Sequence, residues 1–203
     1  MTKLSKVAAL VFLMVFPPLQ AWAIAQTAEQ VVTSTTDQVL KAVSEEGVKQ
    51  DNQKVYAIVE RLIVPHFDFQ KMSQWVLGKY WRDASDSERQ QFTEQFQKLL
   101  VRTYSTAFQQ YSNQKIVYLP TRSNPGADRV MVKCQVVRDA GPPIGIDYRL
   151  YQKQGEWKVF DVLIDGISLV TNYRTTFAQQ IRDKGIDGLI ATLVARNQDA
   201  ARP

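Results

Sequence analysis

The spacing of apolar residues predicts three short helices in the first part of the chain. Apolar side chains recur every three or four positions, which is the period of a helix that buries one face. The segments run from Thr27 to Gly47, from Asp51 to Pro65 and from Asp68 to Gly78. Glycine and proline are expected to end them. The third segment places Phe69, Met72, Trp75 and Val76 on its inward face.

A fourth helix is predicted more strongly than the others. Ser85 and Glu88 have the spacing of a capping box, in which each residue satisfies a free backbone N–H at the helix start. Apolar or small residues then hold one face for about five turns. They are Phe92, Phe96, Leu99, Leu100, Thr103, Ala107, Phe108 and Tyr111.

The pattern changes after Asn113 to the two-residue alternation of strands. Strands are predicted at 114–121, 129–138, 144–153 and 156–164, with turns at 123–126, 139–143 and 154–155. Short turns between successive strands predict an antiparallel meander. Helical spacing returns from Ser168 to Gly185 and from Asp187 onward, and the polar tail from Asn197 is predicted to fray. The order predicts one α+β domain whose four-stranded antiparallel sheet carries helices on one face.

Residues 1–25 have the features of a secretory signal peptide. Two lysines precede an unbroken apolar run at 7–16, and small residues follow at Ala21, Ala23 and Ala25. The run is half of the roughly 20 residues that a membrane-spanning helix needs. We therefore expect cleavage near 23–25, leaving residues 26–203 as a single exported domain.

Charge and cysteine content limit the possible partners. The formal charge is +5, of which two charges lie in the leader, and the basic residues are scattered singly. Export and scattering argue against nucleic acid and favour anionic lipid or an acidic protein partner, although a merely solvated surface is equally compatible. Cys134 is the single cysteine and His66 the single histidine. The fold therefore relies on its core rather than on a disulfide, and a zinc site is not expected.

Catalytic motifs are scarce. The sequence has no glycine-rich phosphate loop, Gly-x-Ser-x-Gly elbow or His-Glu-x-x-His pair. Asp147, Asp161 and Asp165 lie on or near predicted strands, where a pair facing a cavity could supply an acid and a base. They could equally be hydrogen-bonded to backbone. The apolar faces of helices and sheet could fill a core or line a pocket, and periodicity does not distinguish the two.

Several segments, in order, resemble the MlaC family, also called toluene-tolerance proteins. They are 65–72 (PHFDFQKM), 76–85 (VLGKYWRDAS), 92–111 with its Phe, Thr-Tyr and Tyr positions, 157–177 (WKVFDVLIDGISLVTNYRTTF) and 184–189 (KGIDGL). Together they extend over most of the chain after the leader.

The resemblance implies a periplasmic phospholipid carrier rather than an enzyme. The implied fold is NTF2-like, with acyl chains in an apolar cavity between helices and sheet. The implied partners are phospholipid, an outer-membrane lipoprotein–porin complex and an inner-membrane ABC transporter with an MCE-domain ring. The carrier is expected to be a monomer that shuttles lipid between these complexes, with no metal or cofactor and with phospholipid as cargo.

By this resemblance, candidate lipid-lining residues come from the long helix, the sheet and the closing segment. They are Tyr104, Phe108, Tyr111, Val132, Cys134, Val136, Ile144, Ile146, Tyr148, Val159, Val162, Ile167, Val170 and Tyr173. Lys79, Arg82 and Arg174 are candidates for a headgroup rim or a partner surface. Two alternatives remain open at this point: a small-molecule enzyme that uses an inward carboxylate, and a periplasmic chaperone for apolar segments.

Overall fold

The predicted α+β class is confirmed. The computed structural model describes residues 26–110, 114–121 and 126–199. Helices come first: α1 (Ala28–Val43), α2 (Asn52–Leu62), the 3₁₀ turn η1 (Val64–His66), α3 (Phe69–Leu77), α4 (Tyr80–Asp83) and α5 (Asp86–Gln109). The strands β1 (Ile116–Tyr118), β2 (Arg129–Val136), β3 (Ile144–Lys153), β4 (Glu156–Ile164) and β5 (Ile167–Ser168) follow, and then α6 (Leu169–Asp199). The predicted leader and Tyr111 lie outside the described residues.

The predicted helix starts are made by the expected caps. Thr27 and Gln30 exchange both bonds of a capping box at α1, and Ser85 and Glu88 do the same at α5. The Asp51 side chain accepts from two backbone N–H groups at the start of α2. These bonds satisfy donors that a helix start otherwise leaves unpaired, so the sequence defines these boundaries locally.

The sheet is an antiparallel meander in the order β1-β2-β3-β4-β5. Gln154 and Gly155 form the β3–β4 turn, and both have positive φ, as a two-residue type I′ hairpin requires. The sheet has one strand more than predicted, because the two-residue β5 pairs with the end of β4. So short a strand leaves no alternation to read in the sequence.

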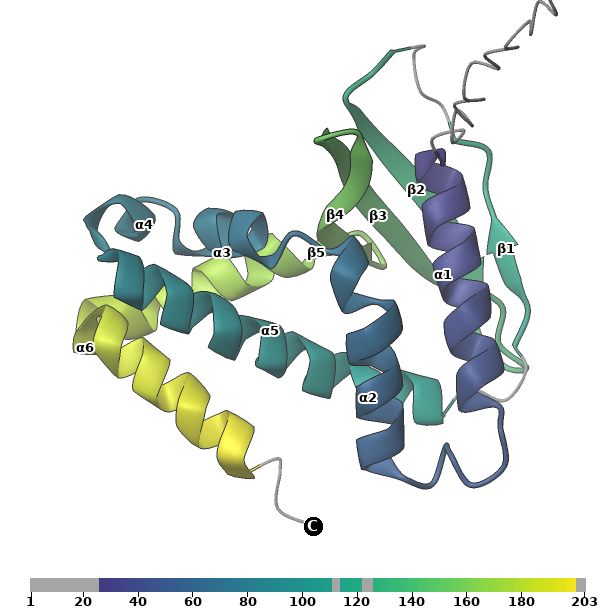
Figure 1. Cartoon of the computed structure of the whole chain (residues 1–203), viewed down its shortest axis with the longest axis horizontal. Helices are drawn as coiled ribbons and strands as arrows, with labels where there is room; N and C mark the ends of the chain where they lie inside the picture. Colours follow the sequence, from purple (N-terminus) through teal and green to yellow (C-terminus); the bar gives the residue numbers. More distant parts are fainter. Residues whose placement is uncertain (1–25, 111–113, 122–125, 200–203) are drawn as a thin grey trace, which may run out of the picture.

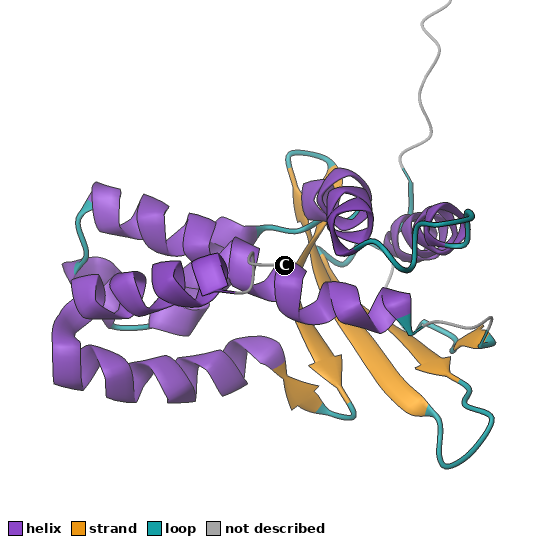
Figure 2. Ribbon diagram, turned by 90° about the horizontal axis from the view of Figure 1, so that it is seen from below, coloured by secondary structure: helices purple, strands orange, loops and turns teal. Residues whose placement is uncertain are grey.

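Helices lie on one face of the sheet and beyond one edge. Figure 1 shows α1 in front of the strands, and α5 running from the helical half of the molecule toward the sheet. Figure 2, seen from below, places α1, α2 and α5 on the same side of the strands. At the edge, Phe67 forms a parallel bridge with Val159, so α3 starts directly beside β4.

Three apolar clusters hold the described elements together. One joins α3, α5 and α6 around Phe92, Phe96 and Phe177. The second joins α1 to the sheet around Val132 and Leu150, and the third joins α1 to α2. Tyr104 and Phe67 contact both the first and the second cluster.

Three points of local structure differ from the sequence-based prediction. Trp75 is 40% exposed rather than inward, because its ring packs edge-on against Phe160 at the margin of the sheet. The short helix α4 was missed. The chain does not fray at Asn197, whose buried amide donates to the Gln95 carbonyl and side chain and keeps α6 in place. The predicted break at Gly185 is confirmed as a non-helical residue (φ 72°, ψ 178°), although helix resumes at once on either side.

Candidate functional site

One face of the sheet is a continuous apolar surface. Strand register places Val132 beside Tyr148 and Tyr148 beside Val162. The next row joins Cys134, Ile146 and Ile164, and the row after it joins Val136 to Ile144. Directly paired residues share a face, so these predicted lining residues are brought together.

A β-bulge completes this face. The register between β3 and β4 shifts at Arg149 and Leu150. Val159 and Val162 therefore both join the apolar cluster on the helix side, although strict alternation would put residues three apart on opposite faces. Val132, Cys134, Val159 and Val162 are buried, whereas Val136, Ile144, Ile146 and Tyr148 keep part of their surface exposed.

The helices that cover this face come from both ends of the helical segment. Ala28 and Val32 of α1 belong to the cluster on the sheet, and Tyr104 of α5 packs against it. Thr35 also lies on α1, and its buried hydroxyl has no hydrogen-bond partner in the described structure. Such a group is costly to bury.

The interface is uncharged at neutral pH. Burial, reinforced by Tyr173, raises the pKa of Tyr104 to about 12. Burial, with a smaller effect from Asp147, raises the pKa of the Cys134 thiol to about 11. Burial likewise raises the pKa of Tyr148. These shifts have the sign that desolvation gives to acidic groups, so the phenols and the thiol stay neutral.

The remaining predicted lining residues lie elsewhere. Val170 and Tyr173 belong to the cluster between α5 and α6, and Phe108 packs against the α1–α2 cluster. Ile167 does not line the interior, because it is 64% exposed on β5 at the edge of the sheet. The prediction grouped these residues from helical or strand periodicity alone. Periodicity identifies an apolar face, but it does not show against which apolar cluster that face packs.

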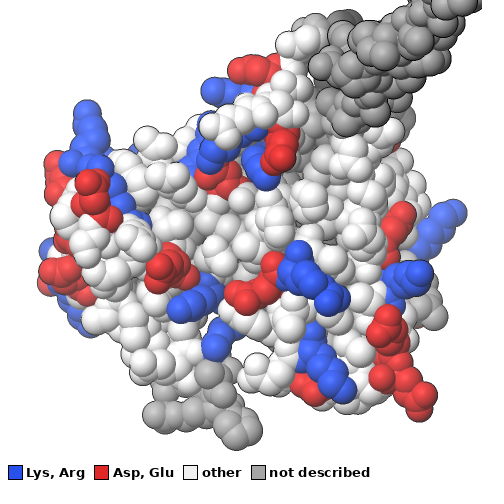
Figure 3. Space-filling model, in the orientation of Figure 1, with Lys and Arg blue, Asp and Glu red and all other residues white. Residues whose placement is uncertain are grey.

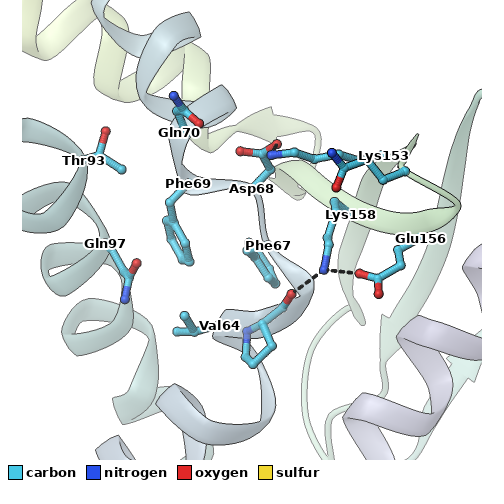
Figure 4. Close-up of a pocket in the computed structure, with 12 residues that line it drawn as sticks. Val64, Phe67, Asp68, Phe69, Gln70, Thr93, Gln97, Lys153, Glu156 and Lys158 are labelled. Carbon is cyan, nitrogen blue, oxygen red and sulfur yellow. Dashed lines mark hydrogen bonds and ion pairs between the residues drawn. The ribbon is translucent and has the colours of Figure 1, made fainter. Parts of the chain in front are cut away.

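A cleft of about 500 Å³ opens between α5, the segment 64–70 and the β3–β4 hairpin. Figure 4 shows Thr93 and Gln97 of α5 on one side, Lys158 and Glu156 of β4 on the other, and Val64, Phe67 and Phe69 between them. The Lys158 ammonium donates to the Pro65 carbonyl at 2.9 Å and pairs with Glu156 at 2.7 Å. Sequence reasoning missed the cleft, because its walls come from three distant stretches of chain.

Asp68 ties the cleft to the sheet. Its buried carboxylate accepts from Lys153 Nζ at 2.8 Å, from the Lys71 backbone N–H at 2.9 Å and from the Tyr151 hydroxyl. Burial opposes ionisation, but these three donors outweigh it and hold the pKa of Asp68 below its usual value. Its own N–H donates to the Val159 carbonyl at 2.8 Å, so the segment is fixed to β4.

The three candidate carboxylates do not face the apolar interface. Asp161, which is 1% exposed, lies with its cross-strand partner Arg149 on the face of the sheet opposite the apolar one. Its carboxylate accepts from Ser168 Oγ at 2.7 Å and from the Val170 N–H. Asp147 forms an ion pair with Lys133 at 3.0 Å, and Asp165 accepts from the Gly145 N–H. These hydrogen bonds and ion pairs support a structural role, most clearly for Asp161, which holds the start of α6.

The three predicted basic residues lie apart from the cleft. Lys79 and Arg82 are exposed at α4, which Figure 1 shows at the far end of the helical half from the sheet. The Arg174 guanidinium packs over Gly78, 3.1 Å from where a β-carbon would be. Figure 3 shows basic and acidic side chains intermingled on the visible face, without a patch of one sign.

The described ranges contain neither a cluster of metal-ligating side chains nor a membrane-spanning helix. No group of three or more His, Cys, Asp or Glu side chains is placed to hold a metal ion there. Likewise, no helix in the part of the chain that the structure describes has the length and apolar character needed to cross a membrane.

Comparisons with known proteins agree with the fold. Residues 33–195 match the family described as MlaC protein. The chain belongs to the MlaC family. A Pseudomonas putida relative named toluene tolerance protein ttg2D is 33% identical, with 95% of this chain and 92% of the relative covered. The Haemophilus influenzae MlaC, named an intermembrane phospholipid transport system binding protein, is 28% identical over 77% of this chain and 73% of its own length.

A solved structure extends the MlaC likeness to three dimensions. The phospholipid-binding protein of Ralstonia solanacearum, solved in complex with a phospholipid, superposes with a TM-score of 0.81 at 32% identity. The match covers 87% of this chain and all of the other.

Proposed function

We propose that this MlaC-family chain is a non-enzymatic phospholipid carrier that holds acyl chains between the apolar sheet face and helices α1 and α5. The observation that carries the proposal is the continuous, uncharged apolar face, only part of which is fully buried. The relatives support it, because one is named for phospholipid transport and another was solved with phospholipid.

The energetics require such a surface. A diacyl phospholipid has on the order of 30 methylenes, and each costs about 0.8 kcal/mol in water. A bare lipid would therefore need roughly 20 kcal/mol or more to cross an aqueous gap. A carrier must offset most of that cost with apolar contacts, yet bind weakly enough for a partner to shift the equilibrium toward release.

Binding requires the layers to separate. Taking about 30 Å³ for each water-sized group, the acyl chains occupy on the order of 900 Å³. The cleft offers about 500 Å³. We infer that α1 and α5 move away from the sheet when lipid enters, because Ile146 and Tyr148 on the sheet face are only partly buried, whereas Phe92 and Phe96 are fully buried between the helices.

The leader and the family support a location and partners for the carrier. We propose that residues 1–25 direct export to the periplasm and that 26–203 form one lipid-binding domain. The proposed partners are an outer-membrane lipoprotein–porin complex and an inner-membrane ABC transporter with an MCE-domain ring. Between them the carrier would act as a monomer, with lipid as its cargo and without a cofactor.

The two alternatives make different predictions. An enzyme needs a carboxylate on the apolar face, whereas Asp147 and Asp161 are paired on the opposite one. A chaperone would bind unfolded polypeptide in preference to extracted phospholipid, which a direct competition measures.

A charge placed on the apolar face tests the carrier. Ile146→Asp should abolish phospholipid retention, because an ionised carboxylate among acyl chains is costly. Gln135→Asp is the matched control, since Gln135 lies on the opposite face of the neighbouring strand. Both variants are first checked for native circular dichroism. Equal lipid retention by folded Ile146→Asp and Gln135→Asp would contradict the proposal.

A further inference from the structure

We propose that the first half of α1, residues 28–32, is the gate of the carrier, and that it opens about a run of hydroxyl residues at 33–36 (TSTT) in the middle of the helix. This inference rests on the proposed carrier function and assigns the first movement to one helix. The second half of α1 stays in place on α2. Lipid enters and leaves where the first half has separated from the sheet.

The two halves of α1 pack into different apolar clusters. Ala28 and Val32 belong to the cluster on the sheet, whereas Val39 and Val43 belong to the cluster that joins α1 to α2. Val39 and Val43 are 1% and 0% exposed, so the second half is firmly packed against α2. The first half contributes an alanine and a valine to the cluster on the sheet, and side chains this small bury little apolar area. The first half can therefore separate while the second keeps its contacts.

The hydroxyl residues between the two clusters weaken the helix. Thr33, Ser34 and Thr36 each donate to the carbonyl of the residue four positions earlier, at 3.0, 2.6 and 2.8 Å. Hydroxyls bonded in this way slightly destabilise a helix and often bend it. Threonine and serine also have a lower helix propensity than alanine. The helix is therefore weakest where its packing changes from one cluster to the other.

Apolar contacts alone hold α1 in place. In the part of the chain that the structure describes, the side-chain hydrogen bonds of α1 and its N-cap all stay within the helix, and no ion pair joins it to another element. By contrast, Gln109 of α5 donates to Asn52 at the start of α2, and Arg102 of α5 donates to Asn197 of α6. Because these polar bonds hold α5 to its neighbours, α1 is the helix that separates first.

Amide hydrogen exchange of the lipid-free mature protein, followed by NMR, tests the gate without any substitution. Opening breaks the backbone hydrogen bonds across the hydroxyl run. After correction for intrinsic rates, the amides of 33–36 should therefore exchange about tenfold faster than those of 40–43, as expected for a segment that opens on its own. Equal protection of the two halves, or faster exchange at 40–43, would overturn the gate.

Alanine in place of the hydroxyl residues tests whether this opening limits lipid exchange. The measurement is the transfer of pyrene-labelled phosphatidylglycerol from the mature protein to unlabelled vesicles. The triple variant Thr33→Ala, Ser34→Ala and Thr36→Ala should transfer about tenfold more slowly, the factor given by the summed helix propensities. Ser34→Gly should transfer about twofold faster, because glycine weakens the helix further. An unchanged rate in the folded triple variant would overturn the gate while leaving the carrier function standing.

The double variant Thr175→Ala and Thr176→Ala is the matched control. Both hydroxyls donate to the carbonyl four residues earlier, at 3.1 Å, but in α6, whose start is fixed to the sheet by Asp161. Transfer by this variant should match the wild type, and an equal slowing of both variants would overturn the assignment to α1. If the wild type takes up none of the labelled lipid, the proposed function fails and the gate fails with it.

Discussion

Replacing Asp161 by Asn separates a structural carboxylate from a catalytic one. Asp161 is 1% exposed, and its carboxylate accepts from the Arg149 guanidinium, the Ser168 hydroxyl and the Val170 N–H. The asparagine side chain has the same size but no charge. Its NH₂ group would face N–H and O–H donors that need an acceptor. Losing one cap costs about 1 kcal/mol, and leaving a buried donor unsatisfied costs about 1–3 kcal/mol. Because Arg149 is 38% exposed, its contribution is discounted.

The expected loss is about 2–4 kcal/mol of unfolding free energy, measured by urea denaturation at pH 7. Asp147→Asn is the control, because its pair with the half-exposed Lys133 is worth at most about 1 kcal/mol. Folded Asp161→Asn should bind phospholipid like the wild type. Equal stability of the two variants, or loss of lipid binding by folded Asp161→Asn alone, would refute the structural role.

Three further predictions concern other parts of the chain. Asp68→Asn should lower the unfolding free energy at neutral pH and make it depend less on pH in the acid range. The folded pKa of Asp68 lies below the unfolded value, so its stabilising contribution is present above about pH 4 and lost as pH falls through the folded pKa. Urea titrations in which variant and wild type lose stability in parallel as pH falls would contradict this. Cys134 should resist alkylation by iodoacetamide at pH 8 unless urea is added, because a pKa of about 11 leaves roughly one thiol in a thousand ionised. Rapid alkylation of the folded protein, measured by mass spectrometry, would contradict this. Gly185→Ala should cost about 1–3 kcal/mol, since its backbone conformation is essentially restricted to glycine. Gly145→Ala should cost less, because the nearest atom to an added β-carbon is Asp165 Oδ1 at 3.6 Å, an ordinary contact. Equal melting temperatures of the two variants would count against the strain at Gly185.

The helices and the sheet could be predicted because their signals are local. Ser85 and Glu88 start α5 through bonds three residues apart, and Gln154 and Gly155 close a hairpin by their own backbone preference. The register of β2 on β3 follows from the alternation of apolar residues, which leaves a single pairing that buries one face.

The site could be predicted only in part, because its remaining features depend on contacts between distant residues. Alternation showed which residues share the sheet face, but not that Ile167 lies uncovered at the edge. The side of the sheet taken by Asp161 depends on a bulge in β3 and β4 that leaves no mark in a single strand. Phe67 and Lys158 meet in the cleft only through the tertiary fold.

Native mass spectrometry of the wild-type protein, purified without detergent from a Gram-negative host, tests the carrier most directly. It reports the mass and number of bound ligands together. We expect a population of the protein carrying a diacyl phospholipid, identified by fragmentation of the released ligand. Protein that is repeatedly free of lipid, and that takes up none when incubated with phospholipid vesicles, would contradict it.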